Sequence, residues 1–508
     1  MSARISPGSF EMSSLEPRTL LSAQSPADLI AVGNRLFFTA EDGVHGRELW
    51  VSDGTAAGTH MVRDIGPGSA GANFYGLTPF GNRLAFTASD GSHGRELWVS
   101  DGTAAGTLMV KDILNGSQEG FPTSLKAIGN TLYFSAGTSS QGRELWKSDG
   151  TAAGTVLVKD INAGSNGSGS LGFTEVNGTI FFSAESQVTT GQGGHTTTTY
   201  YGRELWKTDG TAAGTVMVKD IRPGFGDSSP TELVNLSGTL LFSAYTDLGW
   251  ELWRSNGTSA GTVLVKDINP TFRSGDPRGL RLHGGEVYFN AIDGNFDQNL
   301  WRSDGTEAGT EIATDFAPGF NGVFTPANFI EVGDSVFFAA IGQTLGLELW
   351  RTDHTAGGTA FVKQILSPEV FQTNPYIQPA GGRGGQRMFF TAFDPAVLGL
   401  ELYIVNGTTA TLLRDIFPGN TFSPSPQNFT DANGMLFFTA DDGVHGSELW
   451  VSDGTTAGTR RVDDPAPSPN PRSIRVPIGA PSQTDGATFG GTRIADFLNS
   501  DEEPLVLD

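Results

Sequence analysis

The chain has no cysteine in its 508 residues. Disulfides, thiolate metal sites and cysteine nucleophiles are therefore excluded. Basic residues are scarce as well, because 32 Lys and Arg stand against 55 Asp and Glu, which gives a net charge of −23. Binding to nucleic-acid phosphates needs concentrated positive charge, so nucleic acid is not an expected partner.

Long apolar runs are also missing. No run approaches the roughly 18 residues that a membrane helix requires, so we expect no transmembrane segment. Glycine and proline are abundant, with 69 and 26 residues, but they stay below the level of low-complexity disorder. A hydrophobic content of 37% with 34 phenylalanines provides enough apolar side chains for a packed globular fold.

What the sequence has in abundance is one motif, Glu-Leu-Trp followed by a polar turn. Two altered copies, Asn299-Leu300-Trp301 and Glu401-Leu402-Tyr403, complete a set of nine. Successive copies are 48, 48, 60, 47, 48, 49, 53 and 47 residues apart. Self-similarity at such a period is typical of propellers and solenoids. The tryptophans of the motif are Trp50, Trp98, Trp146, Trp206, Trp253, Trp301, Trp350 and Trp450.

Each unit contains four short strand signals, which in the first unit are 28–32, 35–40, 47–52 and 59–65. Tight Gly-Asn or Asn-Gly turns join the first two strands, so each unit is a four-stranded antiparallel meander. The second strand is apolar on both faces and must be covered on both sides, as in a ring of packed sheets. We therefore predict an all-β propeller of nine blades. Eight blades result if the degenerate unit around Tyr403 forms none, and a solenoid is the second choice.

The consensus Glu-Leu-Trp-x-x-Asp-Gly-Thr-x-x-Gly-Thr resembles the ELWxxDGT repeat of large bacterial surface and secreted proteins, also labelled hyalin-like. The resemblance covers about residues 28–464. In addition, residues 15–23 (Leu-Glu-Pro-Arg-Thr-Leu-Leu-Ser-Ala) resemble the LEPR-XLL segment of planctomycete surface proteins. The resemblance implies an extracellular or cell-surface location in a bacterium and implies no reaction.

Three parts of the chain follow from these patterns. Residues 1–26 are expected to be a targeting segment of the LEPR-XLL kind, and residues 27–464 the propeller. Residues 465–508 begin with four prolines in seven positions and end in an acidic run, which predicts an extended tail or linker.

Recurrence separates structural residues from functional ones. A residue that every blade repeats is expected to serve the blade, so we interpret the motif's tryptophans as wedges between blades. The motif's glutamate is expected to bond to backbone or to pair with the basic residue of the next strand, such as Arg63 or Lys111. His45, His93 and His445 share one loop position and are expected to be architectural or exposed.

The Asp-Gly-Thr loops invite a calcium hypothesis because acidic loops supply oxygen ligands. Asn256 and Asn406 replace the aspartate in two copies, and Asn shares the turn chemistry of Asp without its charge. Turn formation is therefore preferred, with calcium as the disfavoured alternative. No catalytic residue, cofactor-binding residue or metal ligand is assigned.

The places where the repeat breaks are the better candidates for ligand binding. Residues 187–201 hold a 12-residue excess, residues 366–387 form a second irregular insertion, and one tryptophan stands outside the motif. Neutral drift of the loops is the alternative. The candidate ligand-binding residues are Tyr200, Tyr201, Trp250, Phe371, Tyr376 and Arg383.

Three functions are compatible with these patterns. The first is a non-catalytic recognition or adhesion scaffold that binds a polysaccharide or a surface protein through one propeller face. The second is a propeller enzyme of the glycosidase or lyase type, with acids such as Asp247, Asp293 or Asp297 in a funnel. The third is a purely structural wall or matrix component. The sequence favours the first, predicts no enzyme, and sets no oligomeric state.

Overall fold

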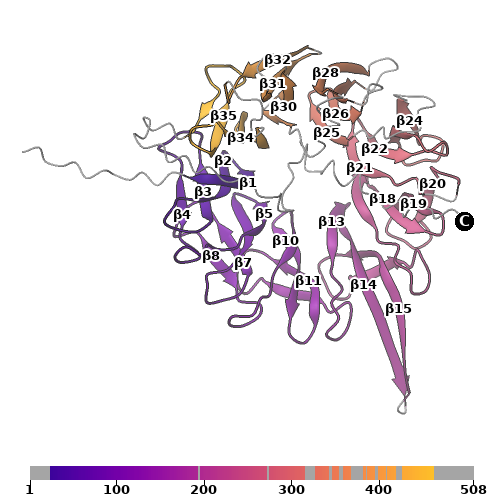
Figure 1. Cartoon of the computed structure of the whole chain (residues 1–508). Helices are drawn as coiled ribbons and strands as arrows, with labels where there is room; N and C mark the ends of the chain where they lie inside the picture. Colours follow the sequence, from indigo (N-terminus) through magenta and orange to yellow (C-terminus); the bar gives the residue numbers. More distant parts are fainter. Residues whose placement is uncertain are drawn as a thin grey trace, which may run out of the picture.

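A computed structural model describes residues 23–462, apart from 193–194, 272–273, 315–326, 342–345, 354–358, 368–380, 385, 395–398, 408 and 419–425. The described residues form nine four-stranded antiparallel sheets, which follow one another around a ring (Figure 1). The chain is therefore a nine-bladed β-propeller, and the predicted fold class is confirmed. Residues 1–22 and 463–508 lie outside the described part, and the predicted tail lies there entirely. Of the predicted targeting segment, only Ala23–Pro26 is described, and its last three residues belong to the first strand.

The first five blades occupy the N-terminal half of the chain. Blade 1 contains β1 (Gln24–Val32), β2 (Arg35–Glu41), β3 (Glu48–Ser52) and β4 (His60–Arg63). Blade 2 contains β5 (Tyr75–Phe80), β6 (Arg83–Ala88), β7 (Glu96–Ser100) and β8 (Leu108–Lys111). Blade 3 contains β9 (Thr123–Ile128), β10 (Thr131–Thr138), β11 (Gly142–Ser148) and β12 (Val156–Lys159). Blade 4 contains β13 (Leu171–Val176), β14 (Thr179–Gln192), β15 (His195–Thr208) and β16 (Val216–Lys219). Blade 5 contains β17 (Thr231–Leu236), β18 (Thr239–Thr246), β19 (Gly249–Ser255) and β20 (Val263–Lys266).

The last four blades complete the ring. Blade 6 contains β21 (Arg278–His283), β22 (Glu286–Ile292), β23 (Gln298–Ser303) and β24 (Glu311–Thr314). Blade 7 contains β25 (Ala327–Val332), β26 (Ser335–Ile341), β27 (Leu347–Thr352) and β28 (Ala360–Leu366). Blade 8 contains β29 (Gly381–Gly384), β30 (Arg387–Asp394), β31 (Gly399–Asn406) and β32 (Thr409–Arg414). Blade 9 contains β33 (Gln427–Ala432), β34 (Met435–Asp441), β35 (Ser447–Ser452) and β36 (Arg460–Arg461).

Each blade is a simple meander whose first strand lies toward the ring axis. The first strands contact one another from blade to blade, as β5 contacts β9 and β13 contacts β17. A two-residue turn leads to the second strand, and in blade 4 both of its residues, Asn177 and Gly178, have positive φ (51° and 78°). This is the backbone that Asn-Gly pairs adopt at low cost in a tight hairpin. The fourth strand therefore ends up at the rim.

The hydrophobic core is distributed between the blades. In β2 the five residues Leu36–Ala40 are all buried, because a blade is covered on both faces. Trp98 of blade 2 packs in one buried cluster with Phe37 and Leu49 of blade 1. The same packing recurs around the ring, so each blade derives much of its stability from its neighbours.

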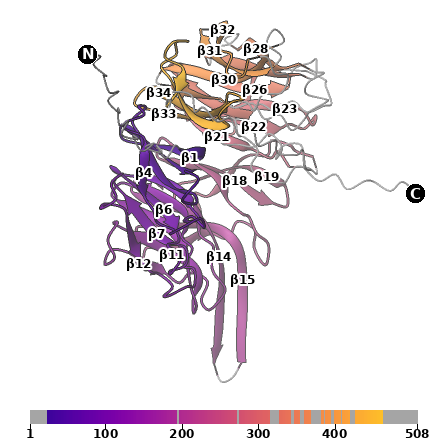
Figure 2. The same cartoon turned by 60° about the vertical axis from the view of Figure 1, so that its left-hand side comes forward.

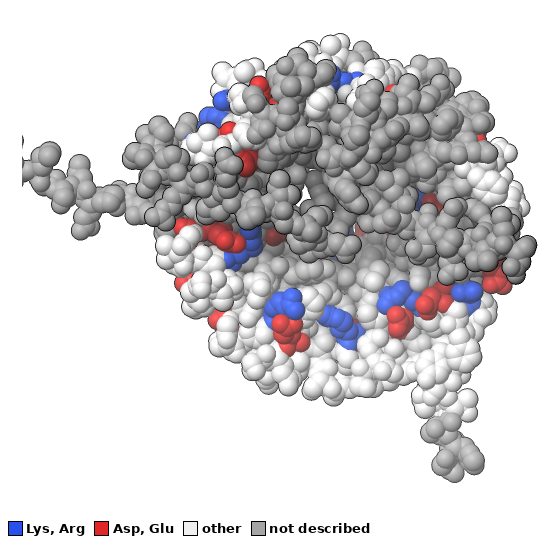
Figure 3. Space-filling view, viewed as in Figure 1, with Lys and Arg blue, Asp and Glu red and all other residues white. Residues whose placement is uncertain are grey.

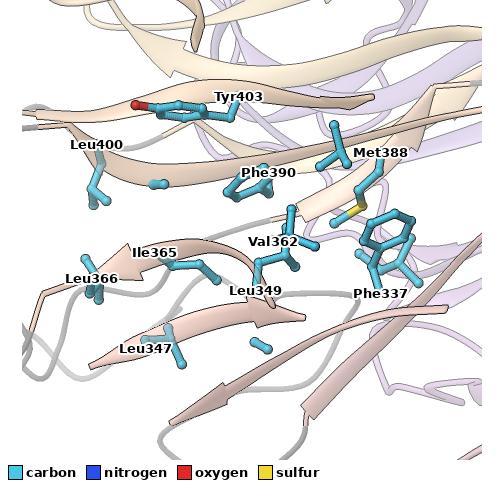
Figure 4. Close-up of a cluster of buried hydrophobic side chains, with 14 residues drawn as sticks. Phe337, Leu347, Leu349, Val362, Ile365, Leu366, Met388, Phe390, Leu400 and Tyr403 are labelled. Atoms are coloured by element: carbon cyan, nitrogen blue, oxygen red, sulfur yellow. The ribbon is translucent and has the colours of Figure 1, made fainter. Parts of the chain in front are cut away.

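The degenerate eighth unit does form a blade, which settles the choice between eight and nine. Tyr403 takes the place of the motif's tryptophan and is buried. Its ring lies 5.6 Å from that of Phe390, in a cluster shared with Leu349 and Val362 of blade 7 (Figure 4). A smaller aromatic ring therefore fills the same position between blades.

All four strands of each blade come from one continuous segment, so the ring is closed by contacts between blades 9 and 1 and not by a blade built from both ends of the chain. Strand β1 packs against β33 and β35 of blade 9. The guanidinium of Arg460 donates to the backbone oxygen of Gly54 at 2.9 Å. The hydroxyl of Thr430 donates to the backbone oxygen of Leu29 at 3.2 Å. These bonds join the two ends of the repeat array.

One element leaves the disc. Strands β14 and β15 continue far past their blade as a two-stranded arm that projects away from the ring (Figures 1 and 2). The 12-residue excess predicted as an irregular loop is therefore a regular hairpin. Within the described residues, no helix is long and apolar enough to cross a bilayer.

Candidate functional site

The motif's glutamate fixes the connection to the next blade. Glu48 is fully buried and accepts hydrogen bonds from the backbone N–H groups of Ile65 (2.9 Å) and Gly66 (3.0 Å). Glu204 accepts from the N–H groups of Ile221 (2.8 Å) and Ser228 (3.1 Å). The first of the two roles predicted for this glutamate, bonding to backbone, is the one observed. Each such side chain holds the inter-blade loop against the end of its own third strand.

Burial dominates the electrostatics of these glutamates. Desolvation raises the pKa of Glu204 to about 7, although the hydroxyl of Ser228 and the backbone donors oppose the rise. Burial has the same effect on the pKa values of Glu48, Glu144 and Glu251, which are also about 7. A raised carboxyl pKa is a common mark of a catalytic acid, but here it recurs in blade after blade and belongs to the architecture.

The recurrent basic residue does not pair with this glutamate, so the second alternative was wrong. Lys219 of blade 4 reaches into blade 5 and donates to the backbone oxygen of Thr262 at 2.7 Å. Its amine lies 5.7 Å from the ring centroid of Trp253. The carbonyl and the ring face together solvate the ammonium group, which spares a buried ion pair.

The Asp-Gly-Thr loops are turns closed by their own side chains. Asp101 accepts from the backbone N–H and the hydroxyl of Thr103 at 2.9 and 2.7 Å. Asn256 accepts from the same two groups of Thr258 at 3.0 and 2.8 Å. The hydrogen bonds of the turn are therefore the same whether the acceptor is the charged Asp101 or the neutral Asn256. Among the described residues, no three His, Asp or Glu side chains gather as a metal site.

The three histidines also act within their loops. The ring of His45 lies 2.8 Å from Asp42 through Nδ1, and that of His93 is placed in the same way by Asp90. Each aspartate also accepts from backbone N–H groups of its loop. His445 repeats the arrangement with Asp442. These pairs hold the loops between the second and third strands.

The predicted ligand-binding residues fall at different places. Tyr200 and Tyr201 lie near the base of the hairpin arm, where Tyr200 is 47% exposed. Trp250 opens the third strand of blade 5 and packs on Tyr245, with ring centroids 5.7 Å apart. Arg383 lies on β29, the first strand of blade 8, 3.8 Å from Asp431 of β33. Phe371 and Tyr376 lie outside the described residues.

A single loop lies between the base of the hairpin arm, which holds Tyr200, and the start of β19, which holds Trp250. Residues 220–230 join blade 4 to blade 5, and within this loop Phe225 meets Tyr200 with ring centroids 5.7 Å apart. Arg222 of the same loop lies over the ring of Tyr245, 4.9 Å from its centroid. The hairpin and the start of β19 therefore flank one loop, and the structure brings Tyr200 and Trp250 to the same side of the ring.

A groove of about 500 Å³ lies between this loop and the base of the hairpin. Phe225 stands 83% exposed at this groove. We call it the hairpin groove; its lining comprises Asn162, Asn166, Gly167, Glu185, Ser186, Gln187, Tyr200, Gly202, Phe225 and Asp227.

Arg203 links the two carboxylates of the hairpin groove. Its backbone N–H donates to Asp227 at 2.8 Å, and its guanidinium forms an ion pair with Glu185 at 3.0 Å. The guanidinium also donates to the backbone oxygen of Gly169 at 3.0 Å. Two exposed carboxylates are thus held at one groove by a single half-buried arginine.

A second groove of about 430 Å³ adjoins the first through Gly167, which lines both. Here the guanidinium groups of Arg95 and Arg143 lie 3.9 and 5.0 Å from the ring centroid of Phe121, and Arg95 also pairs with Glu119. On the face seen in Figure 3, positive and negative side chains lie side by side along an arc. The two grooves therefore lie next to each other on the surface.

Sequence reasoning missed Phe225, Glu185, Asp227 and Arg203. A signal was present, since Phe225 is a lone aromatic residue in an inter-unit loop that opens on the same face as the insertion. The acids named earlier as enzyme candidates have local partners instead. Asp247 is 95% exposed beside Arg222, and Asp293 closes its own turn by accepting from the N–H of Asn295 at 2.8 Å.

Comparison with known proteins gives solved structures only. No protein-family model matches the chain, and no curated protein matches it. The structure resembles a prolyl endopeptidase at 10% identity and a TM-score of 0.41, over 75% of this chain and 56% of that one. It resembles oligopeptidase B from Leishmania major at 10% identity and a TM-score of 0.41, over 74% and 54%. A puromycin hydrolase aligns at 15% identity and a TM-score of 0.38, over 74% and 59%.

These matches correct the predicted function. All three are enzymes, which stands against the predicted non-catalytic recognition or adhesion scaffold and against the prediction of no enzyme. The chain spans little more than half the length of these proteins. At such identities and TM-scores the likeness concerns the fold, and it transfers neither the peptidase activity nor the role of any residue.

Proposed function

We propose that the chain is a propeller enzyme of the glycosidase or lyase type, whose polysaccharide substrate lies in the hairpin groove. The observation that carries the proposal is the meeting of two carboxylates, Glu185 and Asp227, with two exposed aromatic rings, Tyr200 and Phe225, around one groove. These residues come from two strands and one inter-blade loop, and none of them recurs in every blade.

The carboxylates provide the chemistry. Glycoside cleavage uses a pair of carboxyl groups, one to protonate the leaving oxygen and one to activate water or to attack the sugar. Arg203 holds an oxygen of each group, by an ion pair to Glu185 and a backbone hydrogen bond to Asp227. A positioned acid or base typically contributes about 10²–10⁴-fold to a rate. A guanidinium beside them would also stabilise negative charge on an acidic sugar.

The aromatic rings provide the binding surface. Tyr200 and Phe225 present their rings at the groove while the amides of Asn162, Asn166 and Gln187 line it. A sugar offers an apolar face that stacks on such rings and hydroxyl groups that bond to amides and carboxylates. The adjoining groove at Phe121 extends the path, which favours a long polymer over a single sugar.

The test is product release from a panel of neutral and acidic polysaccharides. New reducing ends report cleavage of either type, and absorbance of an unsaturated sugar reports a lyase. Glu185→Gln and Asp227→Asn should each lower the rate by about 10²-fold or more, whereas Tyr200→Ala should mainly raise KM. Asp247→Asn is the matched control, because Asp247 is an exposed acid on the neighbouring blade that does not line the groove.

A double variant Glu185→Gln/Asp227→Asn that folds and retains full activity would overturn the assignment of the groove. Absence of any product from the whole panel would overturn the proposed activity. We also propose an extracellular or cell-surface location, which rests on the resemblance of the repeats to bacterial surface proteins and is checked by fractionating the native cells.

A further inference from the structure

The hairpin arm leaves both of its outer edges without a neighbouring strand in the part of the chain that the structure describes. Strand β13 pairs with β14 only between Thr179 and Ser183, and β16 pairs with β15 only between Leu205 and Lys207. Beyond the bulge at Ser186 and Gln187, the two strands of the arm pair only with each other, from Gln187 with Tyr200 to Gln192 with His195. The distal hairpin, residues 187–192 and 195–200, is thus a two-stranded ribbon with backbone donors and acceptors along each side.

The composition of this ribbon does nothing to protect those edges. Residues 186–202 contain no Lys, Arg, Asp, Glu or Pro, and six of them are threonine. Natural sheets protect an open edge with lysine, proline or a covering element, because an unprotected edge is a template for another strand. Threonine favours extended backbone, and an isolated two-stranded hairpin is only marginally stable in water. The ribbon therefore has the character of a strand pair that is completed by a further strand.

We propose that the outer edge of β15 in the distal hairpin pairs with the same edge in a second copy of this chain, which gives a two-fold symmetric dimer. A second copy is always present at the same concentration, and two identical edges related by a two-fold axis are complementary in an antiparallel pair. The result is a four-stranded sheet between two propellers, with every inner edge hydrogen-bonded.

Charge explains why the contact is made at the end of an arm. Each chain carries a net charge of −23, so two propeller bodies repel each other at close range. The ribbon itself is free of Lys, Arg, Asp and Glu, and the six steps from residue 186 to residue 192 extend about 20 Å at roughly 3.3 Å per residue. This length exceeds the Debye length of about 8 Å at physiological ionic strength. The arms therefore meet while the acidic bodies remain screened from each other.

The arm also directs the contact away from the ring. It projects from the disc in both views (Figures 1 and 2), so that two arms overlap without collision of the blades. Its threonines at 197 and 199 are exposed, and the hydroxyls of Thr189 and Thr198 lie 3.0 Å apart across the strands, which holds the ribbon in register.

The test is the mass of the full-length chain in solution, measured by light scattering or analytical ultracentrifugation over a range of concentrations. The wild type should be a dimer, and higher salt should tighten it. Thr197→Lys/Thr199→Lys should be monomeric because like charges then face each other across the two-fold axis. Thr197→Glu/Thr199→Glu should be monomeric for the same reason.

Mixing the two variants should restore a dimer that contains one chain of each. This rescue separates loss of edge pairing from loss of the hairpin, since a hairpin that had unfolded would not be restored by mixing. A wild type that stays monomeric at micromolar concentrations would overturn the proposal. So would lysine variants that remain dimeric. Neither result bears on cleavage in the hairpin groove, whose carboxylates are untouched by these substitutions.

Discussion

The ammonium group of Lys219 donates to the backbone oxygen of Thr262 across the boundary between blades 4 and 5, at 2.7 Å. A lysine or arginine makes the same bond at five other boundaries within the described residues. The donors are Arg63, Lys111, Lys159 and Lys266, with distances between 2.6 and 2.8 Å, and Arg414, which donates to Thr459. Neighbouring blades are therefore linked by a polar clasp at the rim as well as by the packing of their faces.

Substitution of Lys219 by methionine should destabilise the boundary between blades 4 and 5. The hydrogen bond to Thr262 is lost and the carbonyl keeps no charged donor, which costs about 1–3 kcal/mol. The change is measured as a lower midpoint of thermal unfolding. Lys126→Met is the control, since Lys126 is exposed on an inner strand, and equal losses in the two variants would argue against the clasp.

Trp98→Ala should be among the most damaging single changes in the propeller. Trp98 fills the cluster between blades 1 and 2, and its indole N–H donates to the backbone oxygen of Ala88 at 3.0 Å. Removing a buried tryptophan typically costs about 3–5 kcal/mol. Trp250→Ala, which removes a half-buried ring from the loop face, should cost distinctly less. An unchanged melting temperature for Trp98→Ala would contradict the packing described here.

The buried glutamates should make the propeller less stable as pH rises from about 4.5 to about 7. Burial raises the pKa of Glu204 to about 7, above its ordinary value of 4.5, so in this window the unfolded chain has released a proton that the folded chain still holds. The stabilisation is complete below pH 4.5 and is lost as pH passes 7. It is measured as the melting temperature across this range.

Glu204→Gln should show a flatter pH dependence than the wild type, because the substituted side chain does not titrate. Blade 4 suits this test because the hairpin joins its second and third strands, where blades 1 and 2 have a loop with a histidine. In blades 1 and 2, hydrogen bonds to Asp42 and Asp90 raise the pKa values of His45 and His93, and these histidines titrate in the same direction. If Glu204→Gln and the wild type have parallel pH profiles, the glutamate does not titrate in this range.

Asp101→Asn should leave stability within about 0.5 kcal/mol of the wild type, because Asn256 makes the same two hydrogen bonds in blade 5. Asp101→Ala removes both acceptor bonds to Thr103 and should cost about 1 kcal/mol. Calcium or a chelator should not change the melting temperature of either variant. A calcium-dependent rise in the wild type that Asp101→Asn abolishes would instead assign the loop to metal binding.

Much of the fold could be predicted because it is repeated. The nine motif copies favour nine blades, and Gly-Asn turns between short apolar strand signals predict the four-stranded unit. The weak eighth copy left eight or nine blades open, and the structure shows that Tyr403 fills the tryptophan position of blade 8, which makes nine. Local periodicity and turn chemistry act over a few residues, so one sequence is enough to read them.

The candidate site could be predicted only in part. The insertion that holds Tyr200 was found as a break in the repeat, but its regular hairpin was not, since pairing of Gln187 with Tyr200 depends on register across the turn. Nor could Phe225 be matched with Tyr200, because the two are 25 residues apart and meet only where the loop to blade 5 returns past the base of the arm.

The sequence by itself determined the repeat, the all-β meander and the acidity of the chain, since these follow from residue types and their spacing. Only the tertiary structure decided which partners the recurrent polar groups have. Glu204 accepts from the backbone of the loop that follows its own blade, while Lys219 donates to Thr262 in the next blade. It also decided that the insertion stands out as an uncharged arm. The reason is physical, because hydrogen bonds and strand edges depend on distance in space, which the ring sets and the order of residues does not.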